Sequence, residues 1–429
     1  MTRVLIAGAG ITGLTTALSL HAAGLKATVV DRAPELTPAG VGINLQPHAV
    51  RELTELGLGE ELARIGVSIC EIVHYDRFGS RIWGEPRGIA AGYRWPQYAV
   101  HHGGLHALLL RAVRDRMGED AVVTGLSVEG CAETEDHVRV RLRDRETGGQ
   151  VEWLVDALIG ADGLHSAVRA HLHPGEGPPR HSGILMWRGT AVREPFLTGH
   201  SIIVAGSNST AKFVAYPIAP RTACRTVINW IAEVRLPDRR PAAERTARGR
   251  LDDVLPHYAD WRFGWLDVPE LIRASDEILV HPMADRDPLP RWSTRRITLA
   301  GDAAHPMYPI GANGGSQAIL DARVLAYHLA TAPDVPRAFA AYEEERRPEA
   351  NRIVLANRDL GPERVLRTVA ERAPRGFADV RDVLSAEELD AIGAAYRNTT
   401  SLDVAALNER ASWSVPRAAA GRPRAGRTA

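Results

Sequence analysis

Cysteine and lysine are scarce in this sequence of 429 residues, and neither sign of charge prevails. The three cysteines, Cys70, Cys131 and Cys224, lie far apart without a Cys-x-x-Cys pair, which excludes a disulfide framework and a metal cluster held by cysteine. We therefore expect no bound metal and a reducing, cytoplasmic location. Because 52 Lys and Arg residues balance 52 Asp and Glu residues, no overall field favours nucleic acid or an anionic membrane surface. A small molecule is the expected partner.

A long hydrophobic run is also missing. The uncharged stretch from Val4 to Leu25 has the length of a membrane span, but four glycines and several polar residues interrupt it. We expect neither a signal peptide nor a membrane helix there. With 45% hydrophobic residues the chain can bury a sizeable core, and its length suits two domains better than one.

The start of the chain is typical of a βαβ unit. Residues 3 to 7 and 26 to 32 have the composition of buried strands, and residues 12 to 23 have apolar positions at helical spacing. This predicts a parallel sheet with helices on its faces. Antiparallel strands are expected in 121 to 158 and, as a second and inserted domain, between 181 and 280. Further helices are predicted at 47 to 65, 103 to 117, 316 to 331 and 336 to 360.

A glycine motif follows the first strand. Gly8 permits a tight turn, Gly10 lets backbone approach a pyrophosphate, and Gly13 lets the helix pack on the strand. Asp31, at the end of the next strand, is placed to bind ribose hydroxyls. Ile11, Thr12 and Arg32 complete the expected set. The motif predicts an ADP-containing cofactor, and the alternative is a glycine turn with a structural role only.

A second turn of this kind stands almost three hundred residues later, in ITLAGDAAHPMYPIGANGG at 297 to 315. Asp302, after Gly301 at the end of a predicted strand, can accept hydrogen bonds from a polyol chain. Glycines then allow close backbone approach before a helix, whose N-terminus would stabilise a ring that becomes anionic on reduction. Isoalloxazine is such a ring and nicotinamide is not, so the two turns together favour FAD as the bound cofactor. The expected contacts also include Pro309, Gly311, Ala312, Asn313 and Gly314.

Three motifs together resemble those of a known family. They are the glycine turn with Asp31, GADGLHSAVR at 160 to 169, and GDAAHPMYPIGANGG at 301 to 315, and they resemble the motifs of the single-component FAD-dependent aromatic hydroxylases, the p-hydroxybenzoate hydroxylase-like family. The likeness covers about residues 3 to 360. Other segments are similar to the phenazine-modifying members of that family. These are GVGINLQPHAV (40 to 50), WGEPRGIAAG (83 to 92), PQYAVH (96 to 101), AHLHP (170 to 174), MWRG (186 to 189), DVLPHYADW (253 to 261), MADRDPLPRW (283 to 292) and YRN (396 to 398).

The resemblance implies an α/β fold, with a Rossmann-like FAD-binding domain, an inserted and mostly antiparallel β substrate domain, and a C-terminal helical region. We place the FAD-binding domain at 1 to 75, 100 to 180 and 281 to 365, and the substrate domain at 76 to 99 and 181 to 280. The helical region is placed at 366 to 410 and a disordered tail at 411 to 429. We expect a monomer or a homodimer.

The resemblance also implies chemistry. NADH or NADPH would reduce FAD without a separate dinucleotide domain, and O2 would form a C4a-hydroperoxide that hydroxylates an electron-rich ring. Asp162, Gly163 and Arg169 would lie near the flavin pyrophosphate, and Gly42 would lie beside the cofactor. His102 stands where relatives generally carry Arg, and a neutral imidazole would hold the phosphate or ribityl region less firmly than a guanidinium.

Trp187 and Tyr216 are the residues that we expect in an aromatic substrate pocket, because both lie on predicted strands of the inserted domain. Ordinary sheet core is the alternative for each tryptophan. Arg188 either pairs a substrate carboxylate or, facing away from Trp187, lies at a surface or domain boundary. His305 either contacts substrate or is a hydrogen-bonded structural histidine. The run EEERRPE at 343 to 349 is interpreted as a solvated helix face.

The predicted function is hydroxylation of a polycyclic or heteroaromatic metabolite such as a phenazine, with or without replacement of a ring carboxylate. The same cofactor would also support epoxidation or Baeyer–Villiger oxygen insertion. Halogenation is less favoured, because flavin-dependent halogenases rely on a lysine near the substrate and only Lys212 lies outside the βαβ unit. A flavin-binding regulatory protein without turnover is the alternative from another class.

Overall fold

The computed structural model describes residues 3–37, 40–220, 224–236, 247–400 and 402–415, without the side chains of 395–399. At its centre is a parallel sheet of five strands. Because the strands are parallel, the turns that follow them meet at one edge of the sheet. In spatial order the strands are β21 (Ile297–Leu299), β12 (Ala157–Gly160), β1 (Arg3–Ala7), β2 (Lys26–Val30) and β8 (Val122–Val123). In the pairing of β1 with β12, Val4 lies opposite Ala157, and in the pairing of β12 with β21, Leu158 lies opposite Ile297.

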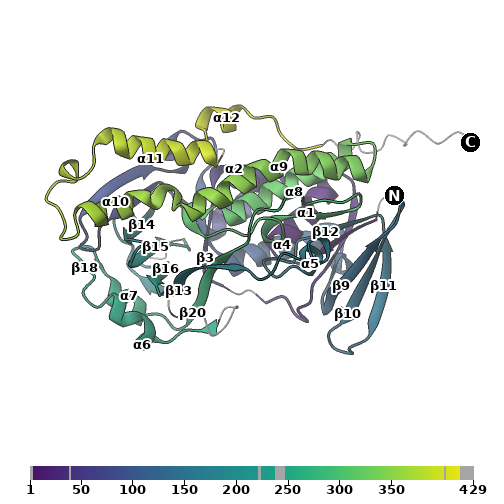
Figure 1. Cartoon of the computed structure of the whole chain (residues 1–429), viewed down its shortest axis with the longest axis horizontal. Helices are drawn as coiled ribbons and strands as arrows, with labels where there is room; N and C mark the ends of the chain where they lie inside the picture. The colour runs from purple at the N-terminus through teal and green to yellow at the C-terminus, as the bar shows by residue number, and fades with distance from the viewer. Residues whose placement is uncertain (1–2, 38–39, 221–223, 237–246, 401, 416–429) are drawn as a thin grey trace, which may run out of the picture.

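Helices cover this sheet largely where the sequence predicts them. Figure 1 shows the long helices α8 and α9 running side by side over the domain. The helix expected at 47 to 65 is instead two helices, because Gly57 adopts a φ of +75° between them. The helices of this region are α1 (Ile11–Ala22), α2 (Pro47–Glu55), α3 (Gly59–Ile65), α4 (His102–Met117), α5 (Ala167–Leu172), α8 (Gly314–Thr331) and α9 (Val335–Arg358).

Two small antiparallel sheets flank the parallel one. The first has the spatial order β11-β10-β9 and projects at the lower right of Figure 1. The second, β3-β7-β4, joins the parallel domain to the larger sheet described next. Their strands are β9 (Leu126–Glu133), β10 (Val138–Asp144) and β11 (Gln150–Val155), and β3 (Gly42–Leu45), β4 (Val67–Ile69) and β7 (Gln97–His101).

The inserted domain is a mixed, mostly antiparallel sheet of eight strands. It includes β5, which begins at Glu71, five residues before the expected boundary at 76, and β20, which continues to Asp285. The boundaries given above therefore stay predictions. In spatial order the strands are β17 (Ala247–Arg248), β20 (Ile278–Asp285), β13 (Arg180–Arg193), β16 (Thr226–Arg235), β15 (Ala211–Pro217), β14 (Ser201–Gly206), β5 (Glu71–Tyr75) and β6 (Arg81–Pro86).

The two faces of this sheet differ. One face packs its aromatic side chains against α6 (Leu251–Val254), the hairpin of β18 (Arg262–Phe263) and β19 (Leu266–Asp267), and α7 (Val268–Arg273). The other face is directed toward the parallel domain, and α10 (Arg364–Arg372) packs against part of it. Figure 1 shows α10 beside β14, with α11 (Ala386–Thr399) above α10 in this view.

The last described segment lies on the parallel domain. After α12 (Val404–Glu409), the Ser412 hydroxyl donates to Glu55 Oε2 at 2.6 Å, and Arg323 donates to the Ser414 hydroxyl at 2.8 Å. The predicted disorder is therefore wrong for 411–415, where serines and Trp413 bind charged groups of α2, α8 and Arg410. The rest of the predicted tail, 416–429, lies outside the described residues. Among the helices that are described, none is both long and apolar enough to span a membrane.

Candidate active site

Three glycine-rich turns are in direct contact at the edge of the parallel sheet. A Cβ atom at Gly8 would lie 2.4 Å from the carbonyl oxygen of Ala161, and one at Gly301 would lie 2.2 Å from Thr12 Oγ1. Both glycines have positive φ, +102° and +58°, which residues with side chains rarely adopt. Only glycine therefore lets the turns after β1, β12 and β21 approach this closely.

The first turn has the shape that a pyrophosphate requires. No atom lies within 4 Å of the position that a Cβ of Gly10 would take, so space is open in front of the N-terminus of α1. Asp31 holds the turn, since its carboxylate accepts hydrogen bonds from the backbone N–H groups of Ala9 at 2.7 Å and Ala33 at 2.8 Å. Arg32 is exposed beside it. Together with Ile11 and Thr12, this arrangement fits the ADP half of FAD.

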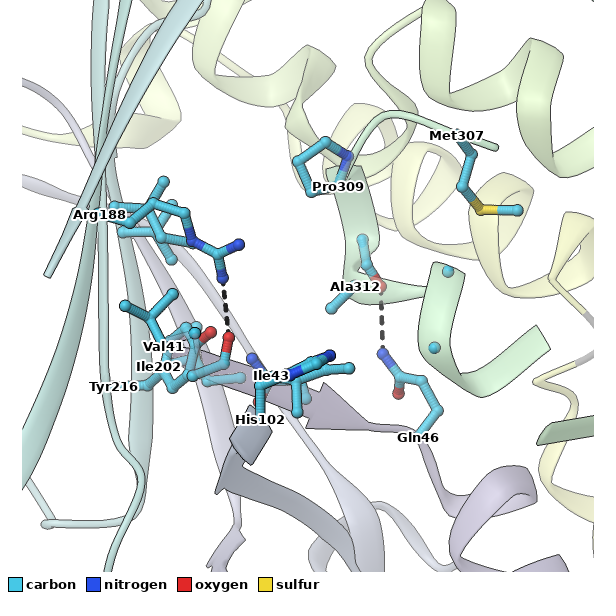
Figure 2. A pocket seen from close by; sticks show the side chains of 18 of the residues that line it. Val41, Ile43, Gln46, His102, Arg188, Ile202, Tyr216, Met307, Pro309 and Ala312 are labelled. Atoms are coloured by element: carbon cyan, nitrogen blue, oxygen red, sulfur yellow. Dashed lines mark hydrogen bonds between the residues drawn. The ribbon is translucent and has the colours of Figure 1, made fainter. Parts of the chain in front are cut away.

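The second turn faces the same space. Gly311 and Ala312 have positive φ, +67° and +53°, and the Gln46 amide donates to the carbonyl oxygen of Gly311 at 3.1 Å (Figure 2). Helix α8 begins at Gly314 and directs its free N–H groups into this space, which suits a ring that gains negative charge. Asp302, Pro309, Gly311, Ala312 and Gly314 line the cavity, while Asn313 is buried behind them.

Asp302 lies in the cavity lining and is exposed there. Desolvation by the surrounding protein raises the pKa of its carboxyl group, while the charge of His305 lowers this pKa and that of Asp321 raises it. A ligand that donates hydrogen bonds to this carboxylate would therefore be bound strongly. The hydroxyls of a ribityl chain are such donors, so the second turn fits the flavin half of FAD.

Asp162 and Arg169 hold the turns from behind. Arg169 is buried, and its guanidinium donates to the carbonyl oxygens of Ala303 at 3.0 Å and Ala304 at 2.8 Å. Asp162 accepts from the Ala167 N–H at 2.7 Å and so caps α5. Neither side chain lines the cavity, whereas Gly163 does. The two residues therefore position the loops that face a cofactor, and the expectation that they lie near its pyrophosphate stays a prediction.

Gly42 and His102 lie where the two domains meet. The Gly42 N–H donates to Asn229 Oδ1 at 2.7 Å, and its carbonyl oxygen accepts from Arg188 at 2.8 Å. A Cβ at Gly42 would lie 2.6 Å from Asn229 Cγ, so a larger residue would push the domains apart. His102 begins α4 and lines the cavity beside Ile43 (Figure 2).

A cavity of about 1160 Å³ lies between these turns and one face of the eight-stranded sheet. Alternate residues of several strands point into it, as in β15, where Val214 and Tyr216 line the cavity and Phe213 and Ala215 enter the core on the other face. Val204, Val214 and Ile231 are neighbours across β14, β15 and β16, and we call these three residues the aliphatic floor. Its shape suits a flat apolar ring.

Tyr216 and Arg188 frame this floor, and Trp187 does not. Tyr216 lies beside Arg188 and Asn44, and burial raises the pKa of its phenol although Arg188 opposes the shift. Strand alternation turns Trp187 to the other face of β13, where it is 1% exposed and packs in the aromatic core. The expectation that Trp187 lines the substrate pocket is therefore wrong. Arg188 projects into the cavity in its place (Figure 2).

His305 is a buried ion-pair residue and not a cavity residue. It is 2% exposed, binds the Asp321 carboxylate through Nε2, and packs beside Trp292. Burial alone would raise the pKa of Asp321, but the charges of His305 and Arg346 outweigh it and hold that pKa below its ordinary value. The interpretation of His305 as a substrate contact is therefore wrong, because the turn folds its side chain back onto α8.

Alongside the floor, on β15 and β16, the cavity carries charged groups that the sequence analysis did not assign. Lys212 is 1% exposed, and its ammonium contacts Glu233 at 2.9 Å and Glu363 at 2.6 Å. Burial raises the pKa of Glu233, with Lys212 opposing. The sequence contained a signal for these residues. Lys212 is two positions from Val214 and Glu233 is two positions from Ile231, so strand alternation places both charged residues on the face of the sheet that carries the floor.

Buried neutral histidines make the fold sensitive to acid. Burial and the charges of Arg346 and Arg410 lower the pKa of His48 from 6.5 to about 3. Because the unfolded chain binds a proton below pH 6.5 and the folded one does not, stability should fall by about 1.4 kcal/mol per pH unit as pH drops from 6.5.

We expect His48→Gln to show a shallower loss of unfolding free energy between pH 6.5 and 5 in urea titrations. The exposed His181→Gln should follow the unmodified protein, and identical slopes for all three would contradict the assignment.

Comparisons with known proteins show the family of this chain. A family model described as an FAD binding domain matches residues 1–357. The chain is 49% identical over 405 residues to the phenazine 1,6-dicarboxylic acid hydroxylase PhzS of Lysobacter antibioticus, covering 92% of this chain and 97% of the relative. It is 35% identical to the aurachin C monooxygenase/isomerase of Stigmatella aurantiaca, covering 83% and 88% of the two chains.

A solved structure has the same fold. The crystal structure of HpxO from Klebsiella pneumoniae, complexed with FAD and uric acid, superimposes with a TM-score of 0.74 at 23% identity. The match covers 94% of this chain and 98% of that one. The α/β fold with an inserted antiparallel sheet is thereby confirmed, and so is FAD as the cofactor. The chain belongs to the FAD-dependent aromatic hydroxylase family and is a flavoprotein monooxygenase.

Proposed function

We propose that this monooxygenase hydroxylates a phenazine carboxylate or a similar planar heteroaromatic carboxylate. Its 49% identity to a phenazine 1,6-dicarboxylic acid hydroxylase supports this substrate class, as does the resemblance to the phenazine-modifying monooxygenase of pyocyanin formation. When bound, FAD supplies electrons taken from NADH or NADPH and delivers one atom of O2 to an electron-rich ring. The oxygen would replace either a ring hydrogen or a ring carboxylate.

The cofactor contacts are part of this proposal. The turn after β1 would hold the pyrophosphate, Asp31 the ribose, and Asp302 the ribityl chain, while the N-terminus of α8 would face the flavin ring. His102 would lie along the middle of the cofactor. The proposed set comprises Gly8, Gly10, Ile11, Thr12, Gly13, Asp31, Arg32, Gly42, His102, Asp162, Arg169, Gly301, Asp302, Pro309, Gly311, Ala312, Asn313 and Gly314.

The observation that carries the substrate proposal is the aliphatic floor with Arg188 at its edge. The floor faces the cofactor turns, so a flat ring lying on it would be presented to the flavin. Arg188 binds the Gly42 carbonyl through one terminal nitrogen, while its buried Nε has no hydrogen-bond partner among the described residues. A guanidinium held in this way is suited to a ring carboxylate.

Enclosure of the cavity also fits this reaction. The Lys212 and Glu363 ion pair joins the sheet to the segment before α10, and Pro362 of that segment lines the cavity. The cavity is therefore walled on the side away from the cofactor turns. Exclusion of water there would favour oxygen transfer to the ring over unproductive release of reduced oxygen.

The proposal is tested with phenazine-1-carboxylate as probe. FAD-loaded protein is mixed with NADH or NADPH, with and without the probe, and the product mass is determined under 18O2. We expect faster consumption of the nicotinamide and a product that contains one 18O atom. An unchanged rate together with recovery of unaltered probe would contradict the proposed substrate class, although the protein would still be a monooxygenase.

Arg188→Met should weaken binding of the carboxylate substrate. Loss of a charged hydrogen bond costs about 1.5–3 kcal/mol, so KM should rise about 10-fold to 150-fold. Arg188→Lys should recover little, because an ammonium cannot form the paired contacts of a guanidinium. The measurement is KM for phenazine-1-carboxylate, with Arg225→Met, an exposed arginine of the same domain, as control. A KM equal to that of the control would exclude Arg188 as the carboxylate partner.

A further inference from the structure

His74 occupies the end of the aliphatic floor opposite to Arg188. His74, Val204, Val214, Ile231 and Arg188 are successive partners across five neighbouring strands, from β5 to β13. The floor between the two polar residues spans two strand spacings, about 10 Å, which is about the length of three fused aromatic rings. Polar groups therefore stand at both ends of a surface that matches one extended ring system.

The imidazole of His74 is held in place by packing, but its ring nitrogens make no hydrogen bond to the described residues. It is fully buried, stacks on the Trp83 ring at a centroid distance of 5.5 Å and lines the cavity. Neither ring nitrogen has a hydrogen-bond partner among the described residues. Burial, with the nearby charges of Arg87 and Lys212, lowers the pKa of His74 to about 3. The ring is therefore neutral, with one N–H donor and one acceptor.

The surroundings of His74 favour a ligand group that accepts hydrogen bonds. Arg87 also lines the cavity and binds Glu85 at 2.8 Å, and Lys212 is bound by Glu233 and Glu363. The carboxylates are thus each engaged by a cation. Burial is the main cause of the lowered pKa of His74, and the charges of Arg87 and Lys212 add to it. A carboxylate placed there would accept a hydrogen bond from the imidazole N–H and lie near these two cations.

We propose that His74 binds a second carboxylate at the far end of the substrate, and so selects planar ring systems that carry acidic groups at both ends. The inference rests on the proposed function, because it takes Arg188 as the partner of the first carboxylate. His74 is then a specificity-determining residue. It holds the long axis of the ring system along the floor, between His74 and Arg188, and hence determines which ring edge faces the cofactor turns.

The test compares two probes on FAD-loaded protein, phenazine-1-carboxylate and phenazine-1,6-dicarboxylate. Their Kd values are measured from the change in flavin absorbance, without NAD(P)H, so the readout is independent of turnover. We expect the unmodified protein to bind the diacid more tightly. His74→Phe, which keeps the stack on Trp83, should weaken diacid binding about 10-fold to 150-fold and leave monoacid binding within about threefold.

Two variants separate this role from a structural one. His74→Gln keeps a donor and an acceptor and should restore much of the diacid preference. His281→Phe removes a cavity histidine near Arg188 and should change the binding of both acids alike. Equal weakening of both acids by His74→Phe, or no change in either, would overturn the His74 proposal. Failure of the unmodified protein to bind either acid would instead overturn the proposed substrate class and this inference with it. If His74→Phe does not fold, as judged by thermal melting, an undiminished diacid preference in His74→Leu would overturn the inference.

Discussion

Asp302→Ala should yield a folded protein that no longer retains FAD on purification. The carboxyl group opens onto the cavity at the turn that fits the flavin half of the cofactor, and no other acidic side chain of the described residues in that turn lines the cavity. Loss of one charged hydrogen bond costs about 1.5–3 kcal/mol, so the Kd for FAD should rise at least about 10-fold to 150-fold. The fold should not suffer, because desolvation by the surrounding protein disfavours the charged form of this carboxyl in the folded chain.

The measurement is the ratio of flavin to protein after gel filtration, followed by titration of the apoprotein with FAD. Asp302→Asn keeps an acceptor oxygen at the same place and should bind FAD with intermediate affinity. Asp252→Ala, an exposed aspartate on α6, provides the matched control and should keep its flavin. Stoichiometric flavin in Asp302→Ala, with an unchanged Kd, would show that the second turn does not hold the cofactor.

The parts of the fold that could be predicted from the sequence are those governed by local steric rules. The βαβ unit, the turn with Gly8 and the turn with Gly301 each depend on residues within a few positions of one another. Parallel pairing then brings the turns to one edge, which follows from topology without knowledge of side-chain packing. The contact of Gly301 with Thr12 is the result of these rules.

The side of the cavity formed by the eight-stranded sheet was less predictable, because a strand presents two faces and the sequence alone does not say which is covered. Trp187 was preferred over Arg188 on residue type, but both faces of β13 are largely buried. Helices α6 and α7 cover the face of β13 that carries Trp187, and this face therefore becomes core. Tyr216 lies in the cavity lining, on a strand where Lys212 and Val214 share its face, and its contact with substrate stays a prediction.

Charged residues were misjudged where their partners are distant in sequence. Arg346, within the run interpreted as a solvated helix face, is 1% exposed and donates to Asp321 at 2.8 Å. The same Asp321 accepts from the backbone of Gly301 at 2.9 Å, so this buried network fixes the second turn. Lys212 and Glu363 are similarly 151 residues apart. Pairs of this kind have no local pattern, and burial of a charge can be recognised only once its partner is placed.

The closest contact between the two cofactor turns leads to the second large prediction. Gly301→Ala would place a Cβ atom 2.2 Å from Thr12 Oγ1 and 3.1 Å from Thr12 Cβ. The left-handed φ of +58° adds a conformational cost of about 1–2 kcal/mol for a residue with a side chain. Overpacking adds about 1–3 kcal/mol. We expect the free energy of unfolding of the apoprotein, measured in urea, to fall by about 2–5 kcal/mol, and FAD to be lost.

Thr12→Ala in the same chain should recover the steric part of that loss and leave the conformational part. The change at Thr12 removes Oγ1 and Cγ2 and keeps Cβ, which lies 3.1 Å from the Cβ added at Gly301. The double variant should therefore be more stable than Gly301→Ala by about 1–3 kcal/mol. Gly148→Ala is the matched control for backbone strain, since Gly148 has a φ of +73° with no atom within 4 Å of the added Cβ. It should lose only about 1–2 kcal/mol. If the losses of unfolding free energy caused by Gly301→Ala and Thr12→Ala simply add, the turns after β1 and β21 are not in contact. The proposal that these two turns bind the same cofactor would then lose its structural basis.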